Sequence, residues 1–288
     1  MEGFIKIGRI FYGLAITGIG LQQLQYGEFR PVLLPGWPSW LPGMTVCAYL
    51  AGVALTGTGL AICLDRKTRS VTLALGGVFL GLFYCVHIPH EIIADPLTRH
   101  LGVWTNAFKV LALSGGAFVL AGVSLIQQKD IVPRYSLLPV LEKVIPFGRF
   151  FLSITMITFG IEHFLYTQTA ATLVPHWIPD PVFWTCLTGV ALISAGVAIM
   201  LNIRMKVVAL LLGTMIFLWV LILHLPRAIS FPSMNKGNEI TSLFEALAFS
   251  GTAFMIAGRL FFYADLKPPL AACPQPGEVP TVLGPTEG

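Results

Sequence analysis

Eight apolar stretches divide this chain, and each is long enough to cross a bilayer core of ~30 Å as a helix. Only 11% of the residues are charged and the mean hydropathy is +0.78, whereas a soluble domain carries roughly 25% charged residues. We therefore expect an all-α, polytopic membrane protein rather than a soluble fold. The predicted transmembrane helices cover residues 4–25, 44–64, 70–89, 104–126, 147–166, 183–202, 205–225 and 241–263.

The distribution of Lys and Arg predicts the orientation, because cytoplasmic loops are enriched in these residues. The loops and ends on one side hold Arg30, Arg99, Arg227 and Lys236. Those on the other side hold Lys6, Arg9, Arg66, Lys67, Arg69, Lys129, Arg134, Lys143, Arg149, Arg204, Lys206, Arg259 and Lys267. We predict a bacterial inner (plasma) membrane protein with both termini cytoplasmic and its Trp- and Pro-rich loops outside. The net charge of +4 is spread over short loops, so no nucleic-acid partner is expected.

The start of the chain leads directly into the first apolar stretch and contains no small-residue cleavage site. We therefore expect a first helix and not a removable signal peptide. The five cysteines form no C-x-x-C and show no metal-ligand spacing. We expect them to be small apolar fillers.

The sequence also contains an internal duplication. Residues 8–11 match 148–151 at an offset of 140, residues 52–55 match 189–192 at 137, and residues 114–118 match 250–254 at 136. Each unit has four spans, so the halves share one orientation and a pseudo-two-fold axis runs along the membrane normal. We predict two parallel four-helix repeats, residues 1–128 and 147–266, joined by a cytoplasmic linker at 129–146. The Pro-rich tail at 267–288 is predicted to be disordered.

Polar side chains gather near the predicted outer ends of the helices. Ionisable groups inside a membrane are costly, so each is a candidate for function. In repeat two the candidate catalytic residues are Glu162, His163, Tyr166, His224 and Glu245. The candidate cofactor-binding residues are Gln22, Gln23, Tyr26, His87 and Lys109 of repeat one, with Trp37 and Trp177 of the outer loops. A rise of ~1.5 Å per residue places eight of these side chains in one layer: Gln22, Gln23, His87, Lys109, Glu162, His163, His224 and Glu245.

Each group also has a structural interpretation. The cluster around Glu162 also fits an interhelical ion-pair or hydrogen-bond network. His87 and His224 each stand two residues before a proline, which predicts that their helices end there and that the histidines cap them. Lys109 can snorkel to the interface, and tryptophans at the outer boundary are typical of an aromatic belt.

Haem and metal sites are disfavoured. A bis-histidine haem would need His87 and His224, which belong to different repeats. A metal site at His87, His90 and Glu91 is interrupted by Pro89. No haem, flavin or iron–sulfur motif is present in the sequence.

Several segments resemble DoxX-like integral membrane proteins. They are Gly-Ile-Glu-His-Phe-Leu-Tyr at 160–166, Leu-Val-Pro-His-Trp-Ile-Pro at 173–179, Phe-Trp-Thr at 183–185, Thr-Gly-Val-Ala-Leu at 188–192 and the segment 106–116. The resemblance covers both repeats, nearly residues 4–263. Repeat one departs from the pattern, because Gln22 and Gln23 stand where repeat two has Glu162 and His163.

The resemblance implies helical bundles and a link to quinones, because the family's name-giving members are membrane subunits of thiosulfate:quinone oxidoreductase. It implies quinone-linked electron transfer near the outer face. Glu162 and His163 would exchange protons with a quinol head group, and Tyr166 would hydrogen-bond a carbonyl. The lack of a C-x-x-C argues against thiol-relay chemistry.

Two other functions stay open. The chain can be a non-catalytic accessory or scaffold subunit of a larger membrane complex, with other membrane or periplasmic subunits docking on its outer Trp/Pro loops. A transporter of a small solute is disfavoured, because no span is clearly broken at mid-membrane.

Overall fold

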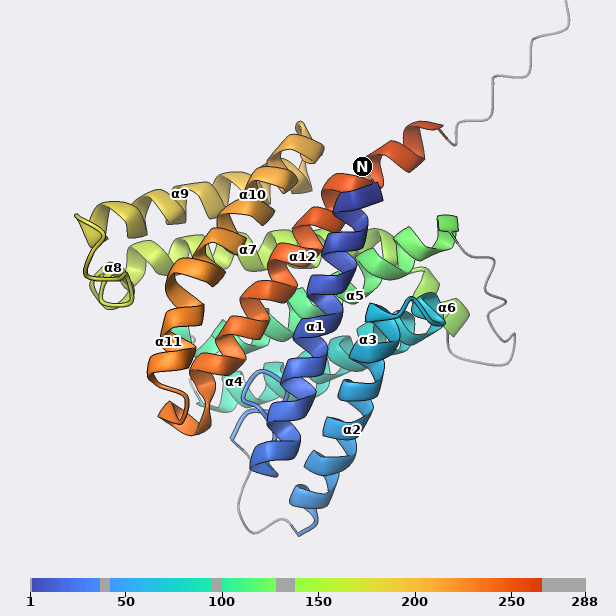
Figure 1. Ribbon diagram of the computed structural model, residues 1–288, viewed down its shortest axis with the longest axis horizontal. Coiled ribbons are helices and arrows are strands. Elements are labelled where there is room, and N and C mark those ends of the chain that lie inside the picture. Colours follow the sequence, from blue (N-terminus) through green and yellow to red (C-terminus); the bar gives the residue numbers. More distant parts are fainter. Residues whose placement is uncertain (1, 37–41, 95–99, 128–137, 266–288) are drawn as a thin grey trace, which may run out of the picture.

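The computed structural model describes residues 2–36, 42–94, 100–127 and 138–265, and this part of the chain is a helical bundle without strands (Figure 1). The prediction of eight helices long and apolar enough to cross a membrane is confirmed. They are Glu2–Tyr26, Met44–Cys63, Thr68–Ile93, Leu101–Ser124, Ile145–Leu165, Pro181–Met200, Met205–Ser230 and Met234–Gly258. The candidate residue Trp37, residues 129–137 of the predicted linker and the predicted Pro-rich tail lie outside the described residues.

The elements follow one another in a similar order in the two halves of the chain. The first half contains α1 (Glu2–Tyr26), α2 (Met44–Cys63), α3 (Thr68–Leu82), the π-helical turn η1 (Phe83–His87), α4 (Ile88–Ala94), the 3-10 turn η2 (Leu101–Trp104) and α5 (Thr105–Gln127). Two short elements, α6 (Leu138–Glu142) and η3 (Ile145–Phe147), connect the halves. The second half contains α7 (Gly148–Leu165), α8 (Thr167–Ala171), α9 (Pro181–Met200), α10 (Met205–Trp219), the π-helical turn η4 (Val220–His224), α11 (Leu225–Ser230), the 3-10 turn η5 (Met234–Lys236) and α12 (Asn238–Asp265).

The prediction that the third and seventh spans end at Pro89 and Pro226 is wrong. A π-helical turn ends at His87 and at His224, and a short helix continues beyond each one. The proline lies two residues after the histidine, in a helix that follows the π-helical turn without a break. The wider π turn resolves the clash that a proline would cause inside a continuous α-helix.

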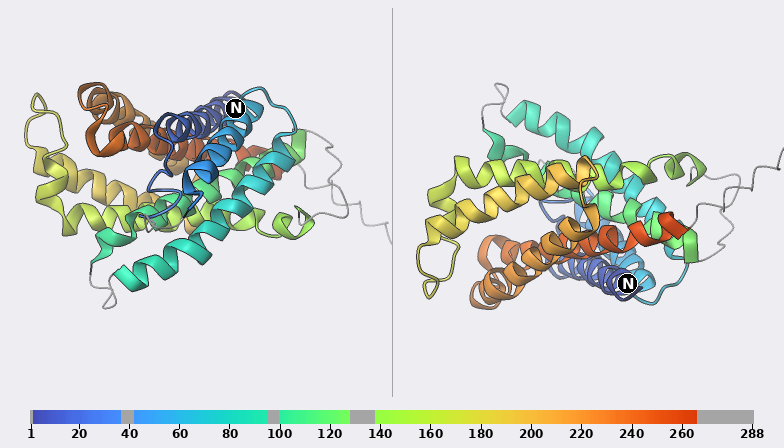
Figure 2. Two further views of the ribbon diagram at one scale, coloured as in Figure 1. Left: turned by 90° about the horizontal axis from the view of Figure 1, so that it is seen from below. Right: turned by 90° about the horizontal axis from the view of Figure 1, so that it is seen from above.

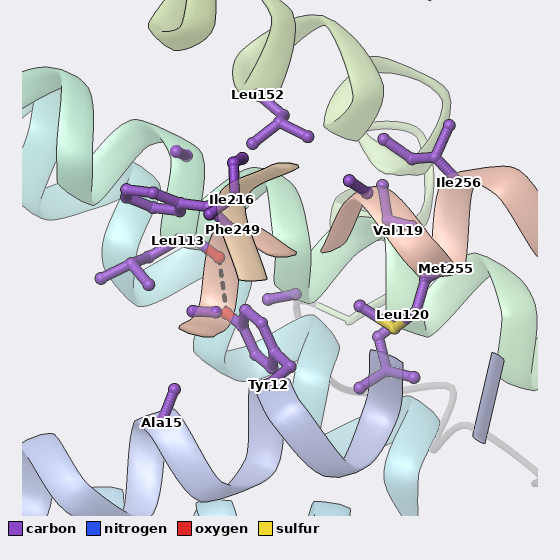
Figure 3. Packing of buried hydrophobic residues seen from close by; sticks show 14 of the residues in the cluster. Tyr12, Ala15, Leu113, Val119, Leu120, Leu152, Ile216, Phe249, Met255 and Ile256 are labelled. Carbon is purple, nitrogen blue, oxygen red and sulfur yellow. Dashed lines mark hydrogen bonds between the residues drawn. The ribbon is translucent and has the colours of Figure 1, made fainter. Parts of the chain in front are cut away.

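The centre of the bundle is formed by α5 and α12. Their spans are 89% and 72% buried, whereas the spans that contain α2, α9 and α10 are about 30% buried. On α1, Tyr12 is fully buried and its hydroxyl donates to the Leu113 carbonyl of α5 at 2.5 Å (Figure 3). Leu152 of α7 and Phe249 of α12 lie in the same cluster. The outer helices instead expose apolar side chains, as the surface of a membrane protein does.

Glycines allow two close helix contacts. A Cβ atom on Gly8 of α1 would overlap the Gly251 carbonyl of α12, and one on Gly148 of α7 would overlap the Gly115 carbonyl of α5. The first long helix of each half thus packs against the last helix of the other half. Small residues permit this approach, which larger side chains would prevent. Figure 2 shows α1 beside α12 and α7 beside α9 in both views.

The long helices begin and end at two opposite ends of the bundle. Phe4 near the start of α1 stacks on Phe254 near the end of α12, with ring centroids 6.0 Å apart. At the opposite end α1 and α7 finish while α5 and α12 begin, as the bond between Gly102 and Tyr166 shows. We call this the Tyr166 end.

Candidate functional site

A cavity of about 340 Å³ lies near the Tyr166 end, between α5, α7, α9, α10 and α12. Its walls are mostly apolar and aromatic, and five ionisable side chains reach it: Lys109, Glu162, His163, His224 and Glu245. This size and composition are typical of a pocket for a small organic molecule. Four of the five predicted catalytic residues line it, together with one predicted cofactor-binding residue, Lys109.

Lys109 and Glu245 form a salt bridge across the centre of the bundle. Lys109 Nζ lies 2.8 Å from Glu245 Oε2, and the two side chains are 17% and 4% exposed. The two positions are separated by 136 residues, the same offset at which residues 114–118 match 250–254. The pair neutralises two charges that would be costly to bury singly.

The Glu162 carboxylate accepts a hydrogen bond from a side chain of α5. The hydroxyl of Thr105 donates to Glu162 Oε1 at 2.9 Å, and the same hydroxyl lies 2.8 Å from the Gly102 carbonyl. The hydrogen bond thus joins the last turn of α7 to the first turn of α5 through Glu162 and Thr105. These two side chains stand at the cavity wall with Lys109.

His163 stands one position along α7 and also reaches the cavity. Its Nδ1 lies 2.7 Å from the Phe159 carbonyl oxygen. A carbonyl oxygen only accepts, so Nδ1 carries the proton of this bond. In the neutral ring Nε2 is then left as the acceptor, which is the arrangement needed to take up a proton.

Tyr166 and Trp177 do not line this cavity. The Tyr166 hydroxyl accepts from the Gly102 backbone N–H at 3.1 Å, which ties the end of α7 to the turn before α5. Trp177 is 73% exposed and lines a neighbouring cavity. Tyr166 therefore holds the backbone near the cavity and does not reach its interior.

Gln22 and Gln23, in the first half of the chain, make hydrogen bonds within the fold. Gln22 donates to the Gly237 carbonyl at 2.9 Å and accepts from Thr241 at 3.0 Å. Gln23 donates to the Ala48 carbonyl at 2.9 Å. None of these side chains lines the 340 Å³ cavity.

His87 and Tyr26 support the connection after α1. His87 is fully buried, with Nε2 3.2 Å from the Val32 carbonyl oxygen and Nδ1 3.9 Å from Glu91. Arg30 covers the Tyr26 ring at 4.6 Å from its centroid and donates to the Lys236 carbonyl. Removal from water lowers the pKa of the Arg30 guanidinium below its ordinary value. Both predicted cofactor-binding residues thus act in packing here.

Sequence reasoning missed several residues of the cavity, above all Thr105, Trp184, Trp219 and Ser242. Thr105 had a usable signal, because it recurs as Thr241 at the same offset of 136 as the surrounding match. Among the described residues, no group of three or more His, Cys, Asp and Glu is placed to hold a metal ion.

Comparison with known families gives one match. The model of a domain of unknown function (DUF8561) matches residues 152–239. The matched segment runs from α7 to the start of α12 and contains Glu162, His163 and His224. No curated protein and no solved structure matches the chain.

Proposed function

We propose that this chain is a DoxX-like integral membrane protein that binds a quinone head group in the 340 Å³ cavity and takes part in quinone-linked electron transfer. The observation that carries the proposal is an apolar cavity with a carboxylate and a proton-accepting imidazole in its wall. A flat apolar ring with two carbonyl or hydroxyl oxygens fits such a lining.

The proposal includes two parallel repeats. Equivalent contacts in the two halves support it: Thr241 donates to Gln22 as Thr105 donates to Glu162. Similarly, Ser114 donates to the Gly76 carbonyl and Ser250 to the Gly213 carbonyl, each at 2.8 Å. Copies of one ancestral unit related by an axis along the membrane normal would produce such pairs.

The two proposed repeats differ at the position that would exchange protons, which is Gln22 in the first and Glu162 in the second. Gln22 is 4% exposed, and its amide both donates and accepts within the fold. An amide does not exchange protons at neutral pH, whereas a carboxylate does. Glu162 occupies the equivalent place in the second half and reaches the cavity. In this proposal repeat one is structural and repeat two carries the chemistry.

The proposed reaction needs acceptors for protons and for electrons. Oxidation of a quinol to a quinone releases two electrons and two protons. Glu162 and His163 Nε2 are the groups that accept the protons, and the electrons pass to a redox centre on a partner subunit. Lys109 balances the negative charge of the carboxylates around it.

The proposed location is a bacterial inner membrane with both termini in the cytoplasm. The distribution of Lys and Arg supports it, because Arg9 and Arg69 lie at the end opposite Tyr166, paired with Asp65 and Glu142 at 2.5 Å. The cavity then opens near the outer face, within reach of periplasmic partners.

Quinone binding tests the proposal. The protein purified in mild detergent should carry quinone detectable by mass spectrometry after solvent extraction. Added ubiquinone-0, which has no tail, should quench tryptophan fluorescence through Trp184 and Trp219. Glu162→Gln should fold and lose at least tenfold in affinity. Glu91→Gln is the matched control, because Glu91 is 4% exposed and does not line the cavity. Equal affinity of wild type and Glu162→Gln would contradict the proposal.

The second candidate is an accessory subunit of a larger membrane complex. The exposed Trp177 favours it, since a large aromatic side chain at 73% exposure suits a protein interface. In that case Trp177→Ala should lose co-purifying subunits, and Glu162→Gln should lower stability or assembly. No quinone should then be found in the purified protein.

A further inference from the structure

A second cavity of about 440 Å³ lies next to the first, between α9, α10 with the turn η4, and the connection 177–179 that precedes α9. The two cavities share four lining residues: Trp184, Thr188, Met215 and Trp219. Because the same side chains line both cavities, the two spaces are adjacent. The tryptophan pair stands at the junction.

The second cavity is open towards the surface of the bundle. Helices α9 and α10 are joined by the short connection 201–204 and diverge towards the Tyr166 end (Figure 1). Two of the lining residues on this side, Leu187 of α9 and Leu218 of α10, are 45% and 49% exposed. Both positions lie inside helices long and apolar enough to span a membrane, so in a bilayer this side of the groove would face lipid, while residues 177–179 close its end.

The lining of this groove contrasts with that of the first cavity. Its residues are apolar or aromatic apart from the hydroxyl of Thr188, and none of them is charged. Such a groove has nothing to hold a polar head group, whereas the adjoining cavity has five ionisable side chains. Together the two spaces match a molecule with a polar head and an apolar chain.

We propose that the ligand is a quinone with a linear isoprenoid tail, which enters sideways from the bilayer between α9 and α10. The head passes Trp184 and Trp219 into the first cavity, and the tail stays in the α9–α10 groove. This inference rests on the proposed function. The adjacency of the two cavities favours this occupant, because a water-soluble ligand would need no lipid-facing groove beside its site.

The two tryptophans form the gate between the spaces. Trp184 begins the second turn of α9 and is 38% exposed, while Trp219 ends α10 directly before the π-helical turn η4. Rotation of either side chain changes the width of the junction without moving a helix. Lateral entry therefore requires no opening of the aqueous end.

The test compares a tailless with a tailed ligand in variants that fill only the groove. Ala191 lines the groove and not the first cavity. Ala191→Phe should weaken binding of ubiquinone-2 at least tenfold and leave binding of ubiquinone-0 within about twofold. Val190→Phe is the matched control, because the adjacent Val190 is 52% exposed and lines neither cavity. It should leave both affinities unchanged.

A second variant, on a different helix, tests whether an effect of Ala191→Phe comes only from distortion of α9. Ile222 lines the groove from the other side, and Ile222→Trp should give the same selective loss of ubiquinone-2. If ubiquinone-2 binds Ala191→Phe and Ile222→Trp as tightly as it binds wild type, or if both ligands are lost together from both variants, this inference is overturned. Binding of ubiquinone-0 to wild type would still support the proposed function. Failure of wild type to bind either quinone would overturn the function and this inference together.

Discussion

Replacing Lys109 by methionine should destabilise the protein strongly, because it leaves the Glu245 carboxylate without its cation. The two charged atoms lie 2.8 Å apart, and Glu245 is 4% exposed. At an effective dielectric constant of ~20, this separation corresponds to an attraction of about 6 kcal/mol. Part of that attraction offsets the desolvation of the two groups, and breaking a buried pair from one side typically costs ~3–5 kcal/mol. At roughly 2–4 °C per kcal/mol, Tm should fall by roughly 6–20 °C.

The assay is thermal unfolding of the purified protein in detergent, followed by tryptophan fluorescence. Lys236→Met is the matched control, because Lys236 pairs with Glu28 at 2.6 Å while the side chains are 67% and 52% exposed. An exposed pair contributes ~0–1 kcal/mol, so Tm should fall by roughly 4 °C at most. The exchange Lys109→Glu with Glu245→Lys should recover part of the loss. Equal Tm values for Lys109→Met and Lys236→Met would refute the reasoning.

Three further predictions concern packing and topology. Tyr12→Phe should lower the free energy of unfolding by ~1–3 kcal/mol, measured by thermal unfolding, because it removes a buried bond to a carbonyl of α5. Gly8→Ala should lower Tm by separating α1 from α12, whereas Gly57→Ala should not lower it, since apart from its own helix backbone nothing lies within 4 Å of the added Cβ. In a cysteine-free background, His176→Cys should react with an impermeant thiol reagent from outside intact cells and Lys67→Cys only after permeabilisation. The reverse labelling pattern would invert the proposed orientation.

The number of spans was predictable from the sequence because helix length and hydropathy are properties of contiguous residues. Lipid leaves few alternatives to the helix, so eight apolar stretches became eight helices. The predicted ends of the third and seventh spans, at Pro89 and Pro226, were wrong. A π-helical turn precedes each proline, and the backbone geometry of such a turn cannot be read from the residue pattern. The repeat offsets likewise align Lys109 with Glu245, but they do not predict that the two side chains form a salt bridge.

Only the tertiary structure shows which polar side chains contact one another, which are buried in hydrogen bonds and which line a cavity. The sequence treats Gln22 and Glu162 as counterparts, yet one is buried in a completed hydrogen-bond pair and the other faces a cavity. The cavity itself depends on how five helices from both halves converge, and the groove beside it depends on the divergence of α9 from α10. Spacing along a helix determines which side chains share a face. The distance between faces of different helices is determined by their packing, which is why the site required the fold.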